Sequence, residues 1–294
     1  MIEPERRSLA TGNGRAVQAT FYAPAVDCRA SVLLVGAMGV NQDYYAAIAT
    51  WLAQQGYLAA TFDFFGVGRS LRGSLRHVEV NILQWAQFDC SAMIDALCAR
   101  QPGKPLFWIG HSLGAQILPF TSNWAKISRA VFIASGSGYW REHPPPLRRR
   151  AIVLWFFLVP LFVSLLGYFP GRRLRTVGDL PGGVIRQWRR WCLDPQYAAG
   201  AEGSWARERY AAVGMAITSI SFTDDEFMSA RNTASLEDHY VHAAKSVRRI
   251  APQDLGVSRI GHFGFFREQF REKLWERCLL PELRLSSPAA CDPT

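Results

Sequence analysis

Short apolar runs alternate with segments of helical spacing along the first half of the chain. The candidate strands are apolar runs at residues 31–35, 57–62, 105–109 and 130–134. Their length and continuous apolar character are typical of strands buried on both faces. Helices are predicted between them, at 43–55, 79–100 and from 115 to about 124. Strands that alternate with helices in this way predict an α/β fold with a mostly parallel, doubly wound sheet.

The two ends of the chain extend this sheet. Residues 6–26 are predicted to form two strands joined by a hairpin at Thr11-Gly12-Asn13-Gly14. The alternation breaks near residue 140 and resumes with strands at 216–222 and 246–250, a helix at 265–280 and a frayed tail at 281–294. We therefore expect a core of residues 1–139 and 211–294, with residues 140–210 inserted after the sixth strand as a helical cap, or lid.

The inserted segment is unusually rich in apolar residues. It holds five of the ten tryptophans, and Ala151 to Gly171 form a run of twenty-one residues without a charge. A run of this length can span a membrane. Pro160 in its middle, arginines on both sides and its place between two strands of one sheet argue against a span. Three interpretations stay open: a helical cap, a cap that also contacts a membrane surface, and a transmembrane helix.

Positive charge is concentrated in the same segment. Residues 141–209 hold twelve arginines, no lysine and five acidic residues, which is +7 of the chain's net charge of +9. Such a patch attracts nucleic acid, anionic lipid or an acidic substrate. No RNA- or DNA-binding motif accompanies it, so we expect no nucleic-acid partner. A solvated face, a membrane surface and an anionic substrate remain.

Cysteine spacing and the start of the chain give weaker indications. The six cysteines form no CxxC pair and show no metal-ligand spacing with histidine, so we expect free thiols, no metal and no organic cofactor. The charged first residues have no apolar stretch behind them, which predicts no secretory signal. Together these features favour a cytoplasmic location.

Residues 110–114 carry the strongest chemical signal. Gly110-His111-Ser112-Leu113-Gly114 has G-x-S-x-G spacing and lies between a predicted strand and a predicted helix. This arrangement is typical of a nucleophile elbow, a strained turn that presents a serine. A serine hydroxyl needs a base to act as a nucleophile near pH 7, and the base needs an orienting acid. Ser112 is therefore the candidate nucleophile.

The expected partners follow Ser112 in the order acid, then histidine. His262 lies between two glycines, after the last predicted strand, and is the candidate base. The acid should follow the strand at 216–222, where Asp224, Asp225 and Glu226 are adjacent. The residue types alone leave the choice among these three carboxylates open.

Acyl transfer also requires backbone N–H groups that hold a developing oxyanion. The residue after the nucleophile, Leu113, should supply one at the start of the following helix. The other should come from the loop after the strand at 31–35, where we choose Met38, with Gly39 behind it to let the backbone turn.

These stretches together resemble the α/β-hydrolase superfamily, and more narrowly its serine-aminopeptidase and monoglyceride-lipase-like branch with a helical cap. The similarity covers about residues 31–139 and 216–280. Its motifs are Gly110–Gly114, a D-x-x-G-x-G-x-S loop at residues 63–70, the Asp224-Asp225 turn and Gly261-His262. Residues 260–267 also resemble a group of poorly characterised bacterial hydrolases. The chain departs from the family at Gly36-Ala37, where the family usually has His-Gly.

The resemblance implies an acid, a reaction and a substrate class. The family's acid commonly precedes a short apolar pair, which favours Asp225, followed by Phe227 and Met228, and leaves Asp224 as the alternative. We expect a serine hydrolase acting on carboxylic esters or related acyl substrates, and the apolar cap favours an apolar small molecule. Two alternatives stay open: an acyltransferase that uses the same triad, and a non-catalytic membrane-associated binding protein. The oligomeric state is not indicated.

Overall fold

One eight-stranded sheet runs through the protein, as seen in a computed structural model that describes residues 2–284. The strand order is β1-β2-β4-β3-β5-β6-β9-β10, and only β2 runs against the other strands. The predicted mostly parallel α/β fold is confirmed. The strands are β1 (Pro4–Ala10), β2 (Ala16–Tyr22), β3 (Ala30–Val35), β4 (Tyr57–Asp63), β5 (Leu106–His111), β6 (Arg129–Ile133), β9 (Ala216–Phe222) and β10 (Lys245–Ile250).

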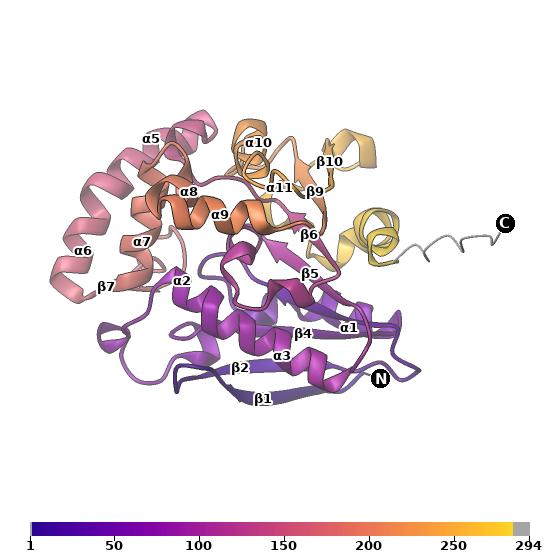
Figure 1. Ribbon diagram of the computed structural model, residues 1–294. Helices are drawn as coiled ribbons and strands as arrows, with labels where there is room; N and C mark the ends of the chain where they lie inside the picture. Colours follow the sequence, from indigo (N-terminus) through magenta and orange to yellow (C-terminus); the bar gives the residue numbers. More distant parts are fainter. Residues whose placement is uncertain (1, 285–294) are drawn as a thin grey trace.

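The central strands are apolar because both of their faces are covered. Every residue of β3, β4 and β5 is buried. In β5, Phe107 and Ile109 belong to one core cluster, and Leu106 and Trp108 belong to the other. Helices therefore pack on both sides of the sheet, as Figure 1 shows. Those of the core are α1 (Ala46–Gln54), α2 (Ile82–Gln84), α3 (Ser91–Arg100), α4 (Leu113–Gln116), α10 (Ala230–Glu237) and α11 (Gly261–Gly264).

The predicted helix from residue 115 to about 124 is wrong, because the helix after β5 stops at Gln116. Pro119 follows in a 3₁₀ turn, Leu118–Phe120. Proline has no N–H to donate to the carbonyl four residues earlier, which is that of Ala115. The Ala115 carbonyl accepts a hydrogen bond from the Tyr240 hydroxyl instead, at 3.1 Å. Tertiary contacts thus replace a turn of helix.

Other boundaries also differ from the predictions. The helix predicted at 79–100 begins at Ile82 and contains a π-helical segment, Trp85–Cys90. The helix predicted at 265–280 is a 3₁₀ turn, Glu268–Phe270, followed by a π-helix, Arg271–Leu279. Helix α10 ends at Glu237, so His239 and His242, for which the sequence predicts a helix, lie outside it.

The start of the predicted frayed tail is ordered. Residues Leu280–Leu283 form a 3₁₀ turn. The Glu282 carboxylate in this turn accepts hydrogen bonds from Arg129 at 2.9 Å and from Arg248 at 2.6 Å, which fix it against β6 and β10. Residues 285–294, and Cys291 with them, lie outside the described part of the chain. The other five cysteines are free thiols.

The segment between β6 and β9 is mostly helical. Helix α5 (Pro145–Val153), a π-helical stretch Leu154–Leu158 and α6 (Val159–Leu166) continue into one another as a single helix. It lies at the left margin of Figure 1, outside the sheet. Gly167, in the left-handed conformation with φ of 79°, ends this helix. The other elements are β7 (Tyr168–Phe169), β8 (Leu180–Pro181), α7 (Gly182–Leu193), α8 (Tyr197–Ala201) and α9 (Ser204–Ala212).

Candidate active site

The carboxyl ends of the central strands bring the predicted site residues to one edge of the sheet. Val35 at the end of β3 pairs with Gly110 in β5, and His111 pairs with Ile133 at the end of β6. The loops that follow these strands are therefore neighbours. In open α/β sheets this edge is where ligands commonly bind.

Ser112 is held in a strained turn between β5 and α4. Its φ of 51° and ψ of −109° are unusual for a residue with a side chain. A Cβ at Gly110 would lie 2.5 Å from the Ala115 nitrogen, and one at Gly114 would lie 2.1 Å from the Val35 oxygen. Only glycine fits at either place: Gly110 because the start of α4 folds back onto it, and Gly114 because the turn packs on β3.

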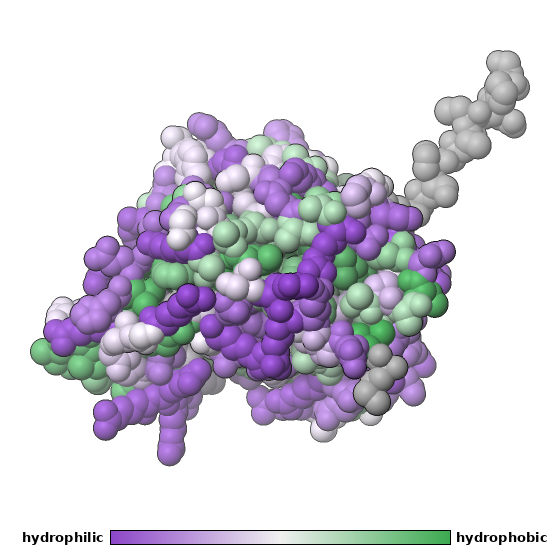
Figure 2. Space-filling view, turned by 90° about the horizontal axis from the view of Figure 1, so that it is seen from below, coloured by the Kyte–Doolittle hydropathy of each residue, from purple (hydrophilic) through white to green (hydrophobic). Residues whose placement is uncertain are grey.

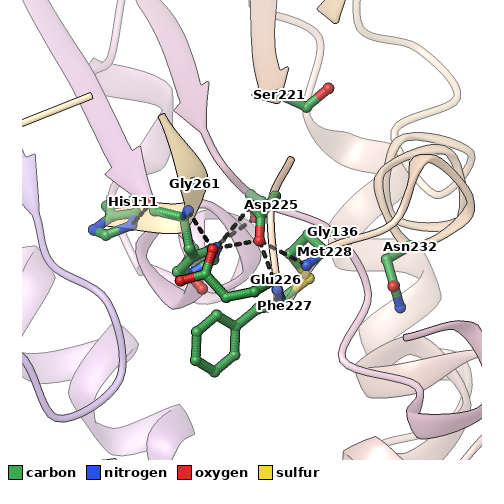
Figure 3. A network of polar contacts seen from close by, with 12 residues as sticks. His111, Gly136, Ser221, Asp225, Glu226, Phe227, Met228, Asn232 and Gly261 are labelled. Atoms are coloured by element: carbon green, nitrogen blue, oxygen red, sulfur yellow. Dashed lines mark hydrogen bonds and ion pairs between the residues drawn. The ribbon is translucent and has the colours of Figure 1, made fainter. Parts of the chain in front are cut away.

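His262 and Asp225 form a buried hydrogen-bonded pair. The His262 Nδ1 lies 2.8 Å from Asp225 Oδ2 and 3.0 Å from Oδ1. The carboxylate also accepts hydrogen bonds from the backbone N–H groups of Phe227, at 2.7 Å, and Met228, at 2.9 Å. Figure 3 shows dashed lines converging on Asp225 and on the neighbouring Glu226. An acceptor fixed in this way holds the imidazole with its proton on Nδ1.

The other two carboxylates of the turn hold the histidine loop rather than the imidazole. Asp224 Oδ2 accepts the N–H groups of Ile260, at 2.8 Å, and Gly261, at 3.0 Å. Glu226 Oε2 accepts the backbone N–H of His262 at 3.1 Å. All three acids therefore act on the same short loop, and only Asp225 reaches the ring.

Ser112 and His262 are both buried, and the residue before Ser112 contacts the His262 backbone. His111, the neighbour of Ser112, has its Nε2 3.1 Å from the His262 carbonyl oxygen. Ser112 is 8% exposed and His262 is 3% exposed. Among residues 2–284, no hydrogen bond joins the Ser112 hydroxyl to the His262 ring. Such bonds are often long without substrate and tighten when it binds.

A second buried series of hydrogen bonds supports this site, and no pattern in the sequence indicates it. The Tyr45 hydroxyl lies 2.8 Å from His111 Nδ1 and accepts the Ala37 N–H at 2.9 Å. Burial, with the nearby His262, holds the pKa of His111 well below its usual value, so the ring is neutral. Because Nε2 faces the His262 carbonyl, it carries the ring's proton, and Nδ1 accepts from Tyr45. These hydrogen bonds connect the loop after β3 to the backbone of His262.

Replacing Tyr45 with phenylalanine should therefore destabilise the protein. The change leaves the Ala37 N–H and His111 Nδ1 buried without their partner. Each unsatisfied buried group costs about 1–3 kcal/mol. We expect the free energy of unfolding, measured by urea denaturation, to fall by about 2–6 kcal/mol.

The adjacent Tyr44 provides a matched control. Its hydroxyl donates to the Phe263 carbonyl at 2.6 Å from a half-buried position, where water can replace it. Tyr44→Phe should lower the free energy of unfolding by no more than about 1 kcal/mol. Equal losses from the two variants would contradict the role given to Tyr45.

The two candidate oxyanion donors lie on adjacent loops. Met38 is in the loop that follows β3, and Leu113 is the first residue of α4. Within the described range, neither backbone N–H donates a hydrogen bond to a protein acceptor. The N–H of the residue before Met38, Ala37, is already used by Tyr45. Both N–H groups are thus available to a ligand.

A cavity of about 490 Å³ lies beside these loops. Gly39 and Tyr44 form part of one wall, Phe263 forms another, and residues 171–178 of the inserted segment line the remaining side of this open cavity. The two sides meet through backbone, since a Cβ at Gly178 would lie 2.4 Å from the Gly39 oxygen. Within residues 2–284 no group of three or more His, Cys, Asp or Glu side chains is placed to hold a metal ion.

Comparisons with known proteins agree with this architecture. Residues 27–166 match the family model described as serine aminopeptidase, S33. No curated protein matches the chain.

Solved structures share the fold at low sequence identity. An esterase of Pyrococcus furiosus, Pf2001, is 14% identical with a TM-score of 0.56, covering 92% of this chain and 86% of its own. Est816, described as an N-acyl homoserine lactone degrading enzyme, is 17% identical with a TM-score of 0.59, covering 90% of this chain and 98% of its own. The thioesterase domain from the curacin biosynthetic pathway is 14% identical with a TM-score of 0.52, covering 85% of this chain and 93% of its own.

Proposed function

We propose that the chain is a member of the α/β-hydrolase superfamily and a serine hydrolase acting on carboxylic esters or related acyl substrates; its sheet has the fold of that superfamily, and residues 27–166 match the serine-aminopeptidase family model. One observation carries the proposal: His262 and Asp225 form an oriented, buried pair, and His111, which precedes Ser112 in a strained elbow, contacts the backbone of the same histidine. Burial and strain of this kind are found where a side chain is held for chemistry rather than for packing.

In the proposed mechanism the Ser112 hydroxyl attacks the acyl carbonyl while His262 Nε2 takes its proton. Asp225 keeps the proton on His262 Nδ1 and stabilises the imidazolium that forms. The free N–H groups of Met38 and Leu113 hold the oxyanion. His262 returns its proton to the leaving oxygen, which leaves an ester on Ser112. Water, deprotonated by His262, then hydrolyses that ester and regenerates the serine.

The surroundings support an apolar acyl group. Aromatic rings surround the imidazole, with the ring centroids of Phe227 and Phe263 4.9 Å and 5.1 Å from that of His262. Phe263 also lines the adjacent cavity, together with Tyr44. Such rings favour a hydrocarbon group next to the imidazole, whereas Arg172 and Arg175 line the side of the cavity that the inserted segment forms.

A panel of p-nitrophenyl esters with acyl chains of two to twelve carbons tests the proposal. We expect nitrophenol release that saturates with substrate and a maximum of kcat/KM at chains longer than acetyl. Adding an alcohol or amine and identifying the products separates hydrolysis from acyl transfer. Free acid as the main product supports the hydrolase, and acylated alcohol or amine as the main product would replace it with an acyltransferase. No release from any ester by folded protein would contradict catalysis on esters.

A further inference from the structure

The helix Pro145–Leu166 is apolar on both of its faces, and only one face is covered by protein. Four residues at intervals of four, Ala151, Trp155, Val159 and Val163, are buried in the core cluster that also contains Val184 and other residues of α7. Arg189 of α7 donates a hydrogen bond to the Trp155 carbonyl at 2.6 Å. A helix that is hydrophobic all round is normally buried all round, so its outer face requires an explanation.

The outer face is a continuous row of exposed apolar side chains. Phe157 is 65% exposed and Leu165 is 64% exposed. Figure 2 shows hydrophobic side chains gathered at the left edge of the molecule, where α6 lies in Figure 1. Contiguous apolar patches of this kind mark interaction surfaces rather than ordinary exposed residues. We call it the outer face and define it as Ile152, Val153, Phe156, Phe157, Leu161 and Leu165.

Both ends of this helix carry exposed positive charge. Arg148, Arg149 and Arg150 lie in its first turns, and Arg172, Arg173 and Arg175 lie in the loop soon after its last residue. None of the six forms an ion pair with another described residue. Their charges are therefore free to meet an anionic partner.

We propose that the outer face docks on the surface of an anionic lipid bilayer, with the helix lying in the plane of the membrane. Apolar side chains would enter the boundary between headgroups and acyl chains, and the arginines at both ends would contact anionic headgroups. This combination of an apolar face and flanking basic residues is the one by which interfacial helices bind membranes.

Two other occupants fit less well. By length and composition the helix could cross a membrane, but its inner face packs on α7, and the chain returns from it to β9, beside β6 in the same sheet. A second copy paired through a two-fold axis with the helices antiparallel would bring Arg148–Arg150 of one copy against Arg172–Arg175 of the other. Like charges at both ends oppose that dimer, whereas an anionic surface attracts both ends at once.

The docking surface adjoins the candidate active site. Arg172 and Arg175 line the cavity that is also bounded by Tyr44 and Phe263. An apolar substrate dissolved in the bilayer would therefore meet the protein near this cavity. The docking proposal goes beyond the proposed reaction and does not require it, because binding can be measured without turnover.

Co-sedimentation of the full chain with 100 nm vesicles tests the proposal. We expect binding to vesicles of phosphatidylcholine and phosphatidylglycerol at about 7:3, at least tenfold weaker binding to pure phosphatidylcholine, and weakening in 0.5 M NaCl. The triple variant Phe157→Glu, Leu161→Glu, Leu165→Glu should reduce binding at least tenfold, as should Arg172→Glu with Arg173→Glu.

A control variant separates this surface from net charge. Val26→Glu, Val241→Glu and Val247→Glu make the same change in charge at exposed apolar positions elsewhere and should bind within about threefold of the unaltered chain. Phe157→Trp adds a reporter at the outer face, and its fluorescence should shift to the blue on binding. Circular dichroism establishes that each variant is folded.

Several results would overturn the proposal. They are no binding of the unaltered chain to the anionic vesicles, equal loss of binding in the control, and no blue shift from Phe157→Trp. Bound protein that alkaline carbonate cannot extract would indicate a membrane span instead. A dimer that the outer-face triple variant dissociates, with no vesicle binding, would indicate a second copy as the occupant. Esterase activity is not read in these experiments, so their failure would leave the proposed reaction untouched.

Discussion

Replacing Ser112 with alanine is expected to lower kcat/KM for p-nitrophenyl ester hydrolysis by about four orders of magnitude or more. The variant keeps the Cβ but loses the oxygen that forms the acyl-enzyme, and no other group in the site can take its place. The backbone at Ser112 is already in its strained conformation with a side chain present. Alanine therefore adds no clash, and the free energy of unfolding should change by less than about 1 kcal/mol.

Ser135→Ala is the matched control for this variant. Ser135 is also buried, and its hydroxyl donates to the Ser112 carbonyl at 2.9 Å, so it contacts the elbow without being placed to react. Steady-state kinetics should give a kcat/KM within about tenfold of the unaltered chain, consistent with the loss of one supporting hydrogen bond. A Ser112→Ala protein that kept more than about one per cent of the activity would remove Ser112 from the mechanism.

Asp225→Asn is expected to lower kcat by about three to four orders of magnitude with little change in KM. An asparagine at this place can present an N–H to His262 Nδ1, which favours the wrong tautomer and gives no charge to stabilise the imidazolium. The backbone N–H groups of Phe227 and Met228 can still bond to the amide oxygen, so the turn should persist. Initial rates with a saturating ester measure the fall in kcat, and circular dichroism shows whether the variant is folded.

Asp224→Asn gives the sharpest comparison with Asp225→Asn, because the same substitution is made at the adjacent position. Asp224 uses a single oxygen, Oδ2, to accept two backbone N–H groups, and asparagine supplies an equivalent oxygen. Asp224→Asn should therefore lower kcat by less than about tenfold. A larger loss from Asp224→Asn than from Asp225→Asn would reverse the assignment of the acid.

The sheet could be predicted from the sequence because its central strands carry a simple signal. β3, β4 and β5 are buried at every position, and the chain marks them with continuous apolar runs between turn residues. The short helix α4 could not be predicted in the same way. It ends early because Pro119 cannot donate the next helical hydrogen bond. The Ala115 carbonyl that this leaves without a helical partner accepts a hydrogen bond from Tyr240, which is distant in the sequence.

The residues of the site also fall into two groups: those that a local sequence pattern indicates and those that only the folded structure brings together. Ser112 and His262 could be proposed because each lies in a local pattern of glycines after a strand. The choice between Asp224 and Asp225 as the acid depends on which side chain faces the His262 ring. The sequence does not reveal this, because the two carboxylates are adjacent. Tyr45 and His111 are separated by 66 residues, and no local pattern connects them. Only the packing of the segment after β3 against the elbow brings them together.

Labelling with a fluorophosphonate tests the central claim most directly, because this reagent reacts with activated serines. The account predicts one adduct on the folded chain, located by peptide mass spectrometry on Ser112, and its absence from the Ser112→Ala and heat-unfolded proteins. Asp225→Asn should label far more slowly than Asp224→Asn. An unlabelled Ser112 in the folded protein, or an adduct on a different residue, would contradict the assignment of Ser112, His262 and Asp225 as the reacting groups.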